Sequence, residues 1–158
     1  MMHMKNQLVC PDAIVPVDAT NIDQAALIHS RSWQESHRHI CTADFLALHS
    51  PQHQRDYLSG EIETGARVFM LIHDRPVGVV SVRDSLIENL YVLPEAQNRG
   101  YGSALLEYAI AQCPSSPTLW ILENNSGAQR LYERRGFRLT GRRNRITDSL
   151  YEIELCLE

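Results

Sequence analysis

The segment Gln97–Ser103 places two glycines between an apolar stretch and a run with helical spacing of apolar residues. A strand that turns directly into a helix leaves the first backbone N–H groups of the helix unpaired, beside the positive end of the helix dipole. Gly100 and Gly102 remove side chains that would keep an anion away from those N–H groups. This spacing predicts a turn that binds the phosphate groups of a ligand.

Two other phosphate-binding motifs do not fit this turn. A dinucleotide-binding fingerprint needs a third glycine, and this chain has Leu105 at that position. A Walker loop needs a lysine before its serine or threonine, whereas Ser103 lies between Gly102 and Ala104. Both alternatives fail on residues that their chemistry requires.

A second motif begins at Asn125 and reads N-x-x-A-x-x-L-Y-x-x-x-G-F through Phe137. Together with the glycine turn it resembles the GNAT superfamily of N-acetyltransferases, from about Val68 to Leu157. The resemblance implies direct transfer of an acetyl group from acetyl-coenzyme A to a primary amine of a small molecule or protein. A catalytically silent acyl-coenzyme A binding or sensor domain is the alternative. The cofactor-binding residues that the resemblance implies are Leu90, Val92, Gln97, Asn98, Arg99, Gly100, Tyr101, Gly102, Ser103, Asn125 and Tyr132.

Such a transfer needs a proton donor for the leaving sulfur and a proton acceptor for the amine. By the same resemblance Tyr132 is the donor, since a tyrosine of pKa about 10 is protonated beside a thiol of pKa about 8.5. Glu88 is the expected base, because it alternates in phase with Leu90 and Val92, which predicts burial and a raised pKa. The resemblance also implies that backbone N–H groups near Val92 and Leu93 polarise the acetyl carbonyl. The alternatives are a core aromatic residue at 132 and an exposed strand carboxylate at 88.

The region before Val68 holds the candidate contacts for the acceptor. By the resemblance, Trp33, His37 and His39 lie in the segment that helps line the acceptor pocket, and a solvated polar loop is the alternative. His49 and His53 have the i,i+4 spacing of two metal ligands on a helix, but no third ligand with clear geometry accompanies them. We therefore expect no metal.

Apolar runs and turn residues along the chain predict the strands and helices that must position these residues. The expected strands cover 13–17, 68–72, 77–82, 86–93, 118–122, 137–145 and 150–157, and the expected helices cover the surroundings of 25–33, 45–48, 52–62, 100–112 and 126–135. Ser36–Cys41 is expected to be irregular. This order predicts an α/β (α+β) fold, GNAT-like, with a mixed and mostly antiparallel sheet of about seven strands and helices on both faces.

The chain has 158 residues, a net charge of −4 and 44% hydrophobic residues, values typical of one globular domain over 1–158, here an acyl-coenzyme A N-acyltransferase domain. No apolar run reaches the ~20 residues of a membrane helix, and residues 1–6 carry no apolar signal core. We expect a cytoplasmic protein without membrane or nucleic-acid partners. The sequence is compatible with a homodimer but does not decide the oligomeric state. Seven arginines between Arg130 and Arg145 predict either a wall near a polyanionic ligand or a solvated face.

Overall fold

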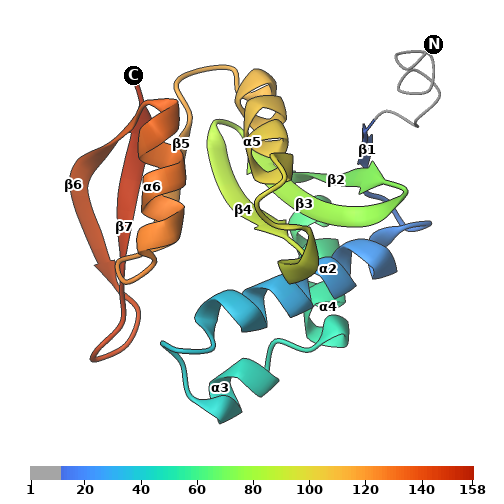
Figure 1. The fold of residues 1–158 in the computed structure, drawn as a ribbon, viewed down its shortest axis with the longest axis horizontal. Helices are drawn as coiled ribbons and strands as arrows, with labels where there is room; N and C mark the ends of the chain where they lie inside the picture. Colours follow the sequence, from blue (N-terminus) through green and yellow to red (C-terminus); the bar gives the residue numbers. More distant parts are fainter. Residues whose placement is uncertain (1–11) are drawn as a thin grey trace.

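A seven-stranded sheet with the order β1-β2-β3-β4-β5-β7-β6 runs through the computed structural model, which describes residues 12–158 (Figure 1). The strands are β1 (Ala13–Pro16), β2 (Arg67–His73), β3 (Arg75–Arg83), β4 (Leu86–Val92), β5 (Thr118–Leu122), β6 (Phe137–Arg145) and β7 (Tyr151–Leu157). Within these residues only β4 and β5 pair in parallel, and all other neighbours are antiparallel. The predicted mixed, mostly antiparallel sheet is confirmed.

Helices cover the two faces of this sheet (Figure 1). They are α2 (Ile22–His37), α3 (Ala43–Ala47), α4 (Pro51–Glu63), the 3₁₀ helix η1 (Pro94–Ala96), α5 (Tyr101–Gln112) and α6 (Ser126–Arg135). The α2 and α4 helices pack against each other and against β2–β4, whereas α5 packs on β3 and β4 from the other face. The glycine turn therefore leads directly into the helix that covers the centre of the sheet.

The close approach of α5 to the sheet depends on Gly78 in β3. A Cβ atom at this position would lie 2.6 Å from Cδ1 of Leu105 and 3.2 Å from the Tyr91 carbonyl oxygen. Leu105 is fully buried, so the residue that occupies the third position of the glycine motif is a core contact of α5. A side chain at position 78 would force α5 away from the sheet and displace the turn that precedes it.

The end of α2 differs from the prediction. The segment expected to be irregular begins at Ser36, but α2 continues through His37. Two side chains bind the carbonyl oxygen of Trp33 in the last turn: Ser36 Oγ at 3.2 Å and His37 Nδ1 at 2.7 Å. The bond to Trp33 fixes the direction of the His37 ring in the last turn of α2, so His37 belongs to a helix and not to a loop.

The segment 1–6, on which the expectation of no signal core rests, lies outside the described residues. From residue 12 to residue 158, no helix combines the length and the apolar character that crossing a membrane requires.

Candidate active site

The site begins where β4 and β5 separate. In the described part of the chain these strands pair at two positions, Leu86 with Thr118 and Ile87 with Leu119, and then diverge. The rest of β4 therefore has no strand partner on the side facing β5. An unpaired strand edge inside a fold offers N–H and C=O groups to a ligand.

Leu90 and Val92 present their backbone groups to this opening. The N–H of Leu93 donates to the carbonyl of Val77 at 2.8 Å, so alternation along the antiparallel ladder turns the N–H groups of Val92 and Leu90 away from β3. The expectation that Leu93 polarises a carbonyl is wrong, because its N–H is already bonded. Val92 keeps a free N–H at the opening.

A groove of about 600 Å³ runs from this opening along the glycine turn and α6. Its lining includes the predicted residues Leu90, Val92, Gln97, Asn98, Gly100, Tyr101, Gly102, Ser103 and Asn125. Arg99 is exposed and is not among the lining residues. The structure thus brings nine of the eleven predicted cofactor-binding residues to one groove, whereas Arg99 and Tyr132 do not line it.

The glycine turn fits the phosphate groups of a cofactor. Gly100 precedes α5 with a φ of +87°, a left-handed conformation that favours glycine. Ala104 donates the first helical bond, to the carbonyl of Gly100, which leaves the N–H groups of Tyr101, Gly102 and Ser103 at the open end of the helix. These N–H groups and the helix dipole together favour an anion.

A second space of about 260 Å³, which we call the acceptor cavity, lies on the α2 and α3 side of the same opening. Its walls come from Trp33 and His37 of α2, Phe45 of α3, β4 and β5, and the β6–β7 turn at Ile146 and Leu150. The groove and the acceptor cavity share four lining residues: Leu90, Tyr91, Asn125 and Ala128. Two ligands, one in each space, would meet between β4 and β5.

Asn125 and Tyr132 bring α6 to this meeting point. Asn125 is the N-cap of α6, and its side-chain oxygen accepts a hydrogen bond from the N–H of Ala128 at 3.1 Å. Tyr132 lines the acceptor cavity, lies edge-on to Phe137 at 5.8 Å, and is 7% exposed. Burial raises the pKa of Tyr132 to about 12, so its hydroxyl stays protonated at neutral pH.

A β-bulge decides the direction of Glu88. Ser81 pairs with Asn89 and Val82 with Ile87, so Glu88 is an extra residue in β4 without a partner in β3. The predicted alternation with Leu90 and Val92 is wrong for this reason. Those two side chains lie near Gly102 on the α5 side, whereas Glu88 turns toward Arg83 and α4.

Glu88 shares the guanidinium of Arg83 with a second carboxylate. Nε of Arg83 lies 3.4 Å from Oε1 of Glu88, and an NH2 atom of Arg83 lies 3.2 Å from Oε2 of Glu61. Oε1 of Glu88 and Oε1 of Glu61 are buried and accept no hydrogen bond from the described residues. Burial, with a contribution from Glu61, raises the pKa of Glu88 to about 7, although Arg83 opposes the shift. The raised pKa agrees with the prediction, but the side chain is only partly buried and lies beside Arg83 and not among apolar residues.

The comparisons with known proteins agree with this geometry. A family model described as an acetyltransferase (GNAT) domain matches residues 64–139. The family model, the curated relatives and the solved structures together support a GNAT superfamily assignment. That match begins just before β2 and ends in β6, so it contains the glycine turn and the Asn125 motif.

Curated relatives carry N-acetyltransferase names. The peptidyl-lysine N-acetyltransferase YjaB of Salmonella typhimurium is 32% identical over 69 residues, which are 44% of this chain and 47% of that protein. The probable N-acetyltransferase Rv2775 of Mycobacterium tuberculosis is 40% identical over 57 residues, 35% of this chain and 33% of that protein. The chain spans about half the length of the YjaB proteins it matches.

Solved structures show the same fold over nearly the whole chain. The PaiA N-acetyltransferase of Thermoplasma acidophilum, solved in complex with coenzyme A, has a TM-score of 0.70 at 14% identity and covers 92% of this chain and 98% of its own. Apo YjaB of Escherichia coli has a TM-score of 0.68 at 21% identity and covers 93% of this chain and 97% of its own.

The histidine-rich wall of the acceptor cavity is built around Trp33. The rings of His37 and His49 stack on it, with centroids at 4.0 and 3.5 Å and nearly parallel planes. His37 is 7% exposed, and burial lowers its pKa. His39 is exposed and does not line the cavity, so the structure brings Trp33 and His37 to the site but leaves His39 outside.

The spacing of His49 and His53 has a packing explanation. Their rings meet edge to face at 5.3 Å, and Nδ1 of His49 lies 3.1 Å from the carbonyl oxygen of Phe45. Among residues 12–158 no group of three potential ligands is placed to hold a metal ion.

Arg134 is a groove residue that sequence reasoning did not single out. It lines the groove with Gly127 and Leu131, and these three residues share one face of α6 at i, i+4 and i+7. Helical periodicity from Asn125 would have found it. Among the described residues that line the groove, Arg134 is the only arginine.

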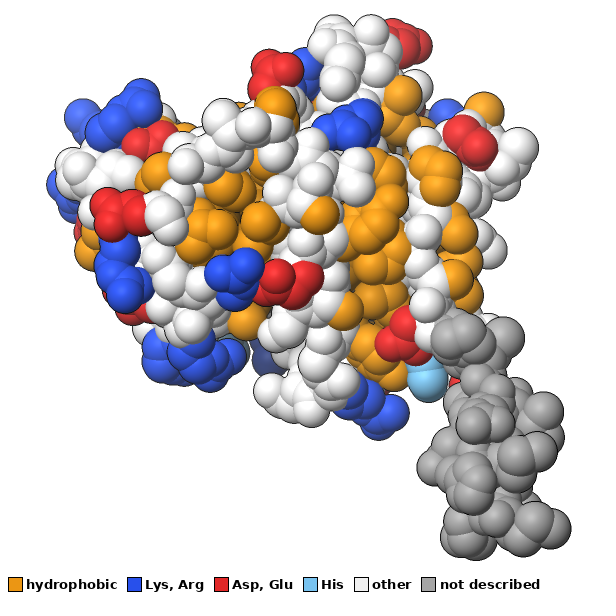
Figure 2. Space-filling model, turned by 90° about the horizontal axis from the view of Figure 1, so that it is seen from above, with side chains coloured by type: hydrophobic (Ala, Val, Ile, Leu, Met, Phe, Trp, Pro, Cys, Tyr) orange, Lys and Arg blue, Asp and Glu red, His pale blue; other side chains and the backbone are white. Residues whose placement is uncertain are grey.

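Most of the other C-terminal arginines form a solvated, paired surface. Figure 2 shows Lys and Arg side chains gathered at the end of the molecule that contains α6 and β6. Four of them pair with carboxylates: Arg135 with Glu107, Arg142 with Glu154, Arg143 with Glu123 and Arg145 with Asp148. Of the seven arginines between Arg130 and Arg145, only Arg134 lines the groove, so the interpretation as a wall near a polyanionic ligand stays a prediction for that residue.

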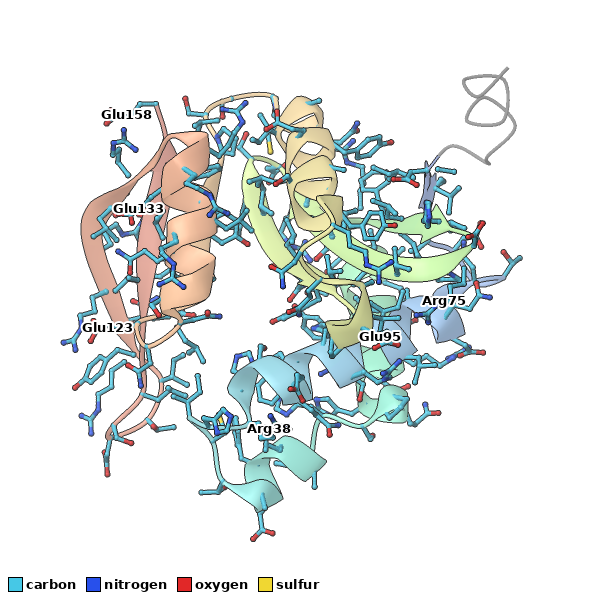
Figure 3. The ribbon with its side chains drawn as sticks, viewed as in Figure 1. Arg38, Arg75, Glu95, Glu123, Glu133 and Glu158 are labelled. Atoms are coloured by element: carbon cyan, nitrogen blue, oxygen red, sulfur yellow. The ribbon has the colours of Figure 1, made fainter. Side chains whose placement is uncertain are left out.

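An ion-pair bridge connects the glycine turn to α2. Glu95 of η1 accepts hydrogen bonds from Arg31 of α2 at 2.9 and 3.0 Å, and from Arg75 of β3 at 3.4 Å (Figure 3). Arg31 lies two residues before Trp33. The bridge thus joins the helix that carries the acceptor wall to the segment that leads into the turn.

Proposed function

We propose that this chain is an N-acetyltransferase that uses acetyl-coenzyme A and transfers its acetyl group directly to a primary amine. The observation that carries the proposal is the meeting of the groove and the acceptor cavity where β4 and β5 separate. Tyr132 reaches this point from α6, and Glu88 reaches the acceptor cavity from the α4 side. A proton donor and a proton acceptor therefore flank the place where two bound ligands would touch.

The groove offers contacts along the length of the cofactor. The N–H groups of Tyr101, Gly102 and Ser103 would bind the pyrophosphate, and the guanidinium of Arg134 suits a further phosphate. The free edge at Leu90 and Val92 would pair with the amides of the pantetheine arm as a strand would. Support also comes from the PaiA neighbour, which was solved in complex with coenzyme A.

The amine must lose a proton before it attacks, and a residue of this chain would accept that proton. An alkyl ammonium of pKa about 10.4 costs on the order of 4.6 kcal/mol to deprotonate at pH 7. Glu88 would take that proton, because a carboxylate with a pKa of about 7 is available at neutral pH and is a stronger base than an ordinary one.

Bound acetyl-coenzyme A would supply an activated thioester. As the amine nitrogen bonds to the acetyl carbon and the carbon–sulfur bond breaks, the N–H of Val92 would stabilise the negative charge on the carbonyl oxygen. The hydroxyl of Tyr132 would give its proton to the departing sulfur, which leaves as the thiol. No residue of the chain needs to carry the acetyl group.

Steady-state thiol release tests the proposal. The purified chain is mixed with acetyl-coenzyme A and a panel of amines that includes small primary amines and a lysine-containing peptide. We expect continuous release of free coenzyme A with at least one amine, and an acetylated product by mass spectrometry. Binding of acetyl-coenzyme A by calorimetry without turnover on any amine would instead support the silent sensor domain. The name of the YjaB relatives favours including the peptide.

A further inference from the structure

The walls of the acceptor cavity differ in chemistry from the rest of this arginine-rich chain. Among the described residues that line the cavity there is no lysine or arginine, although the sequence has fifteen. The lining instead holds two carboxylates, Glu88 and Glu152, and the aromatic residues Trp33, Phe45 and Trp120. A cavity with negative charge and aromatic walls favours a cation that carries apolar surface.

The two carboxylates are not equivalent. Glu152 already accepts a hydrogen bond from the Asn144 side chain at 3.4 Å. Oε1 of Glu88 is buried and accepts no hydrogen bond from the described residues, and its ion-pair partner Arg83, at 3.4 Å, is shared with Glu61. A buried, unsatisfied carboxylate oxygen gains most from a charged donor, so the cavity has one preferred position for an ammonium group. That position is next to the opening between β4 and β5.

Trp33 presents an edge to the cavity and not a face. Two imidazoles in nearly parallel planes, both within 4.0 Å of the indole centroid, would overlap if they lay on the same side. His37 and His49 therefore cover opposite faces of the indole. An aromatic edge carries partial positive charge and packs best against the face of another ring.

The size of the cavity limits the acceptor. Small-molecule sites usually span about 300–1,000 Å³, and this cavity of about 260 Å³ lies just below that range. Phe45 and the exposed Ile146 contribute apolar walls from α3 and from the β6–β7 turn. A compact, mostly apolar molecule fits this space better than a long polycation or an amino sugar.

We propose that the acceptor is a small arylalkylamine, a primary amine joined through a short aliphatic chain to one aromatic ring. This inference rests on the proposed acetyltransferase function and names its substrate class. The ammonium lies at Glu88, and the ring lies against the aromatic wall that Trp33 and Phe45 form together, with their own ring centroids 5.8 Å apart. A second ammonium in the amine would have only Glu152 to pair with, and this carboxylate already accepts a hydrogen bond from Asn144. A lysine side chain would leave the aromatic walls without a ring to pack against.

A matched amine series tests the acceptor class in the full chain with acetyl-coenzyme A. We expect kcat/KM for 2-phenylethylamine to exceed that for n-hexylamine about fivefold, because only the first has a ring to pack against Trp33. We expect it to exceed the value for 1,5-diaminopentane about 100-fold, because the second ammonium is desolvated. A higher value for the diamine, for n-hexylamine or for a lysine-containing peptide would overturn the arylalkylamine assignment and leave the acetyltransferase function standing. Failure of every amine to release thiol would overturn that function itself.

Substitutions near the acceptor cavity can distinguish the loss of a contact with the aromatic ring of the amine from damage to the fold. Phe45→Ala should lower kcat/KM for 2-phenylethylamine about fivefold and leave n-hexylamine within about twofold, since only the first loses a ring contact. The control is Leu48→Ala, which removes an exposed apolar side chain just after α3 that does not line the cavity. Equal losses for both amines in Phe45→Ala would contradict the proposal, whatever the control does.

Discussion

The groove and the acceptor cavity meet at one point but are built in different ways. Most of the groove comes from one continuous segment, 97–103, together with one face of α6. The cavity draws on α2, α3, β4, β5, α6 and the β6–β7 turn, which are distant in the sequence. Under the proposed function, the cofactor would be bound through backbone N–H groups and glycines, whereas the acceptor would contact side chains that tertiary packing assembles.

The first way to test this contrast is to remove the proton donor where the two spaces meet. Tyr132→Phe keeps the ring and its edge contact with Phe137 but deletes the hydroxyl. We expect kcat to fall about 100-fold, because a general acid contributes roughly that factor, while the Kd of acetyl-coenzyme A stays unchanged. Calorimetry and initial rates measure the two quantities. An unchanged kcat would show that Tyr132 only packs in the core and does not act as a proton donor.

A smaller effect is expected when the groove alone is altered. A Cβ at Gly102 meets only ordinary contacts at 3.9 Å or more, so Gly102→Val leaves the fold intact but places a branched side chain in the groove. We expect the affinity for acetyl-coenzyme A to fall about tenfold, since the side chain covers the free N–H groups. Gly60→Val in α4, which has no neighbours within 4 Å, is the matched control. If both folded variants bind acetyl-coenzyme A with equal affinity, the glycine turn does not bind the cofactor.

Glu88→Gln tests the acceptor side, and its effect depends on pH. The folded pKa of about 7 means that Glu88 is protonated, and inactive as a base, below that pH. In the wild type kcat/KM should therefore rise through about pH 7. In the variant we expect a loss of about tenfold at pH 7.5 that shrinks as rising pH frees the amine without help. A loss that is the same at every pH would assign Glu88 to ammonium binding without proton transfer.

The smallest expected change is a displacement of that pH profile. Glu61→Gln removes a negative neighbour of Glu88 and leaves Arg83 to pair with Glu88 alone, so the pKa of Glu88 should fall. The rising limb of kcat/KM should move to lower pH by about one unit, with little change at its plateau. Glu63→Gln, an exposed residue of the same helix, is the control. A limb that stays in place would show that Glu61 does not act on the base.

Local rules predicted much of the fold. β5, α6 and β6 have the predicted bounds, because Asn125 caps α6 and Gly136 ends it with a φ of +109°. The direction of Glu88 could not be predicted in the same way, because the bulge exists only in the pairing of β4 with β3. The Trp33 stack likewise depends on His49, which comes from beyond the end of α3, so helical spacing alone does not reveal it.

The bridge from Glu95 to Arg31 has a consequence for the order in which ligands bind. An acceptor that displaces α2 must also act on the segment before the glycine turn, so each ligand changes the affinity for the other by the same factor. Both partners are about half exposed, so this mutual effect should be small and should fade in high salt. Measuring the affinity for acetyl-coenzyme A with and without a bound amine, at low and high salt, would detect it. Binding in the groove and binding in the acceptor cavity would then be thermodynamically coupled, although the two ligands occupy separate spaces.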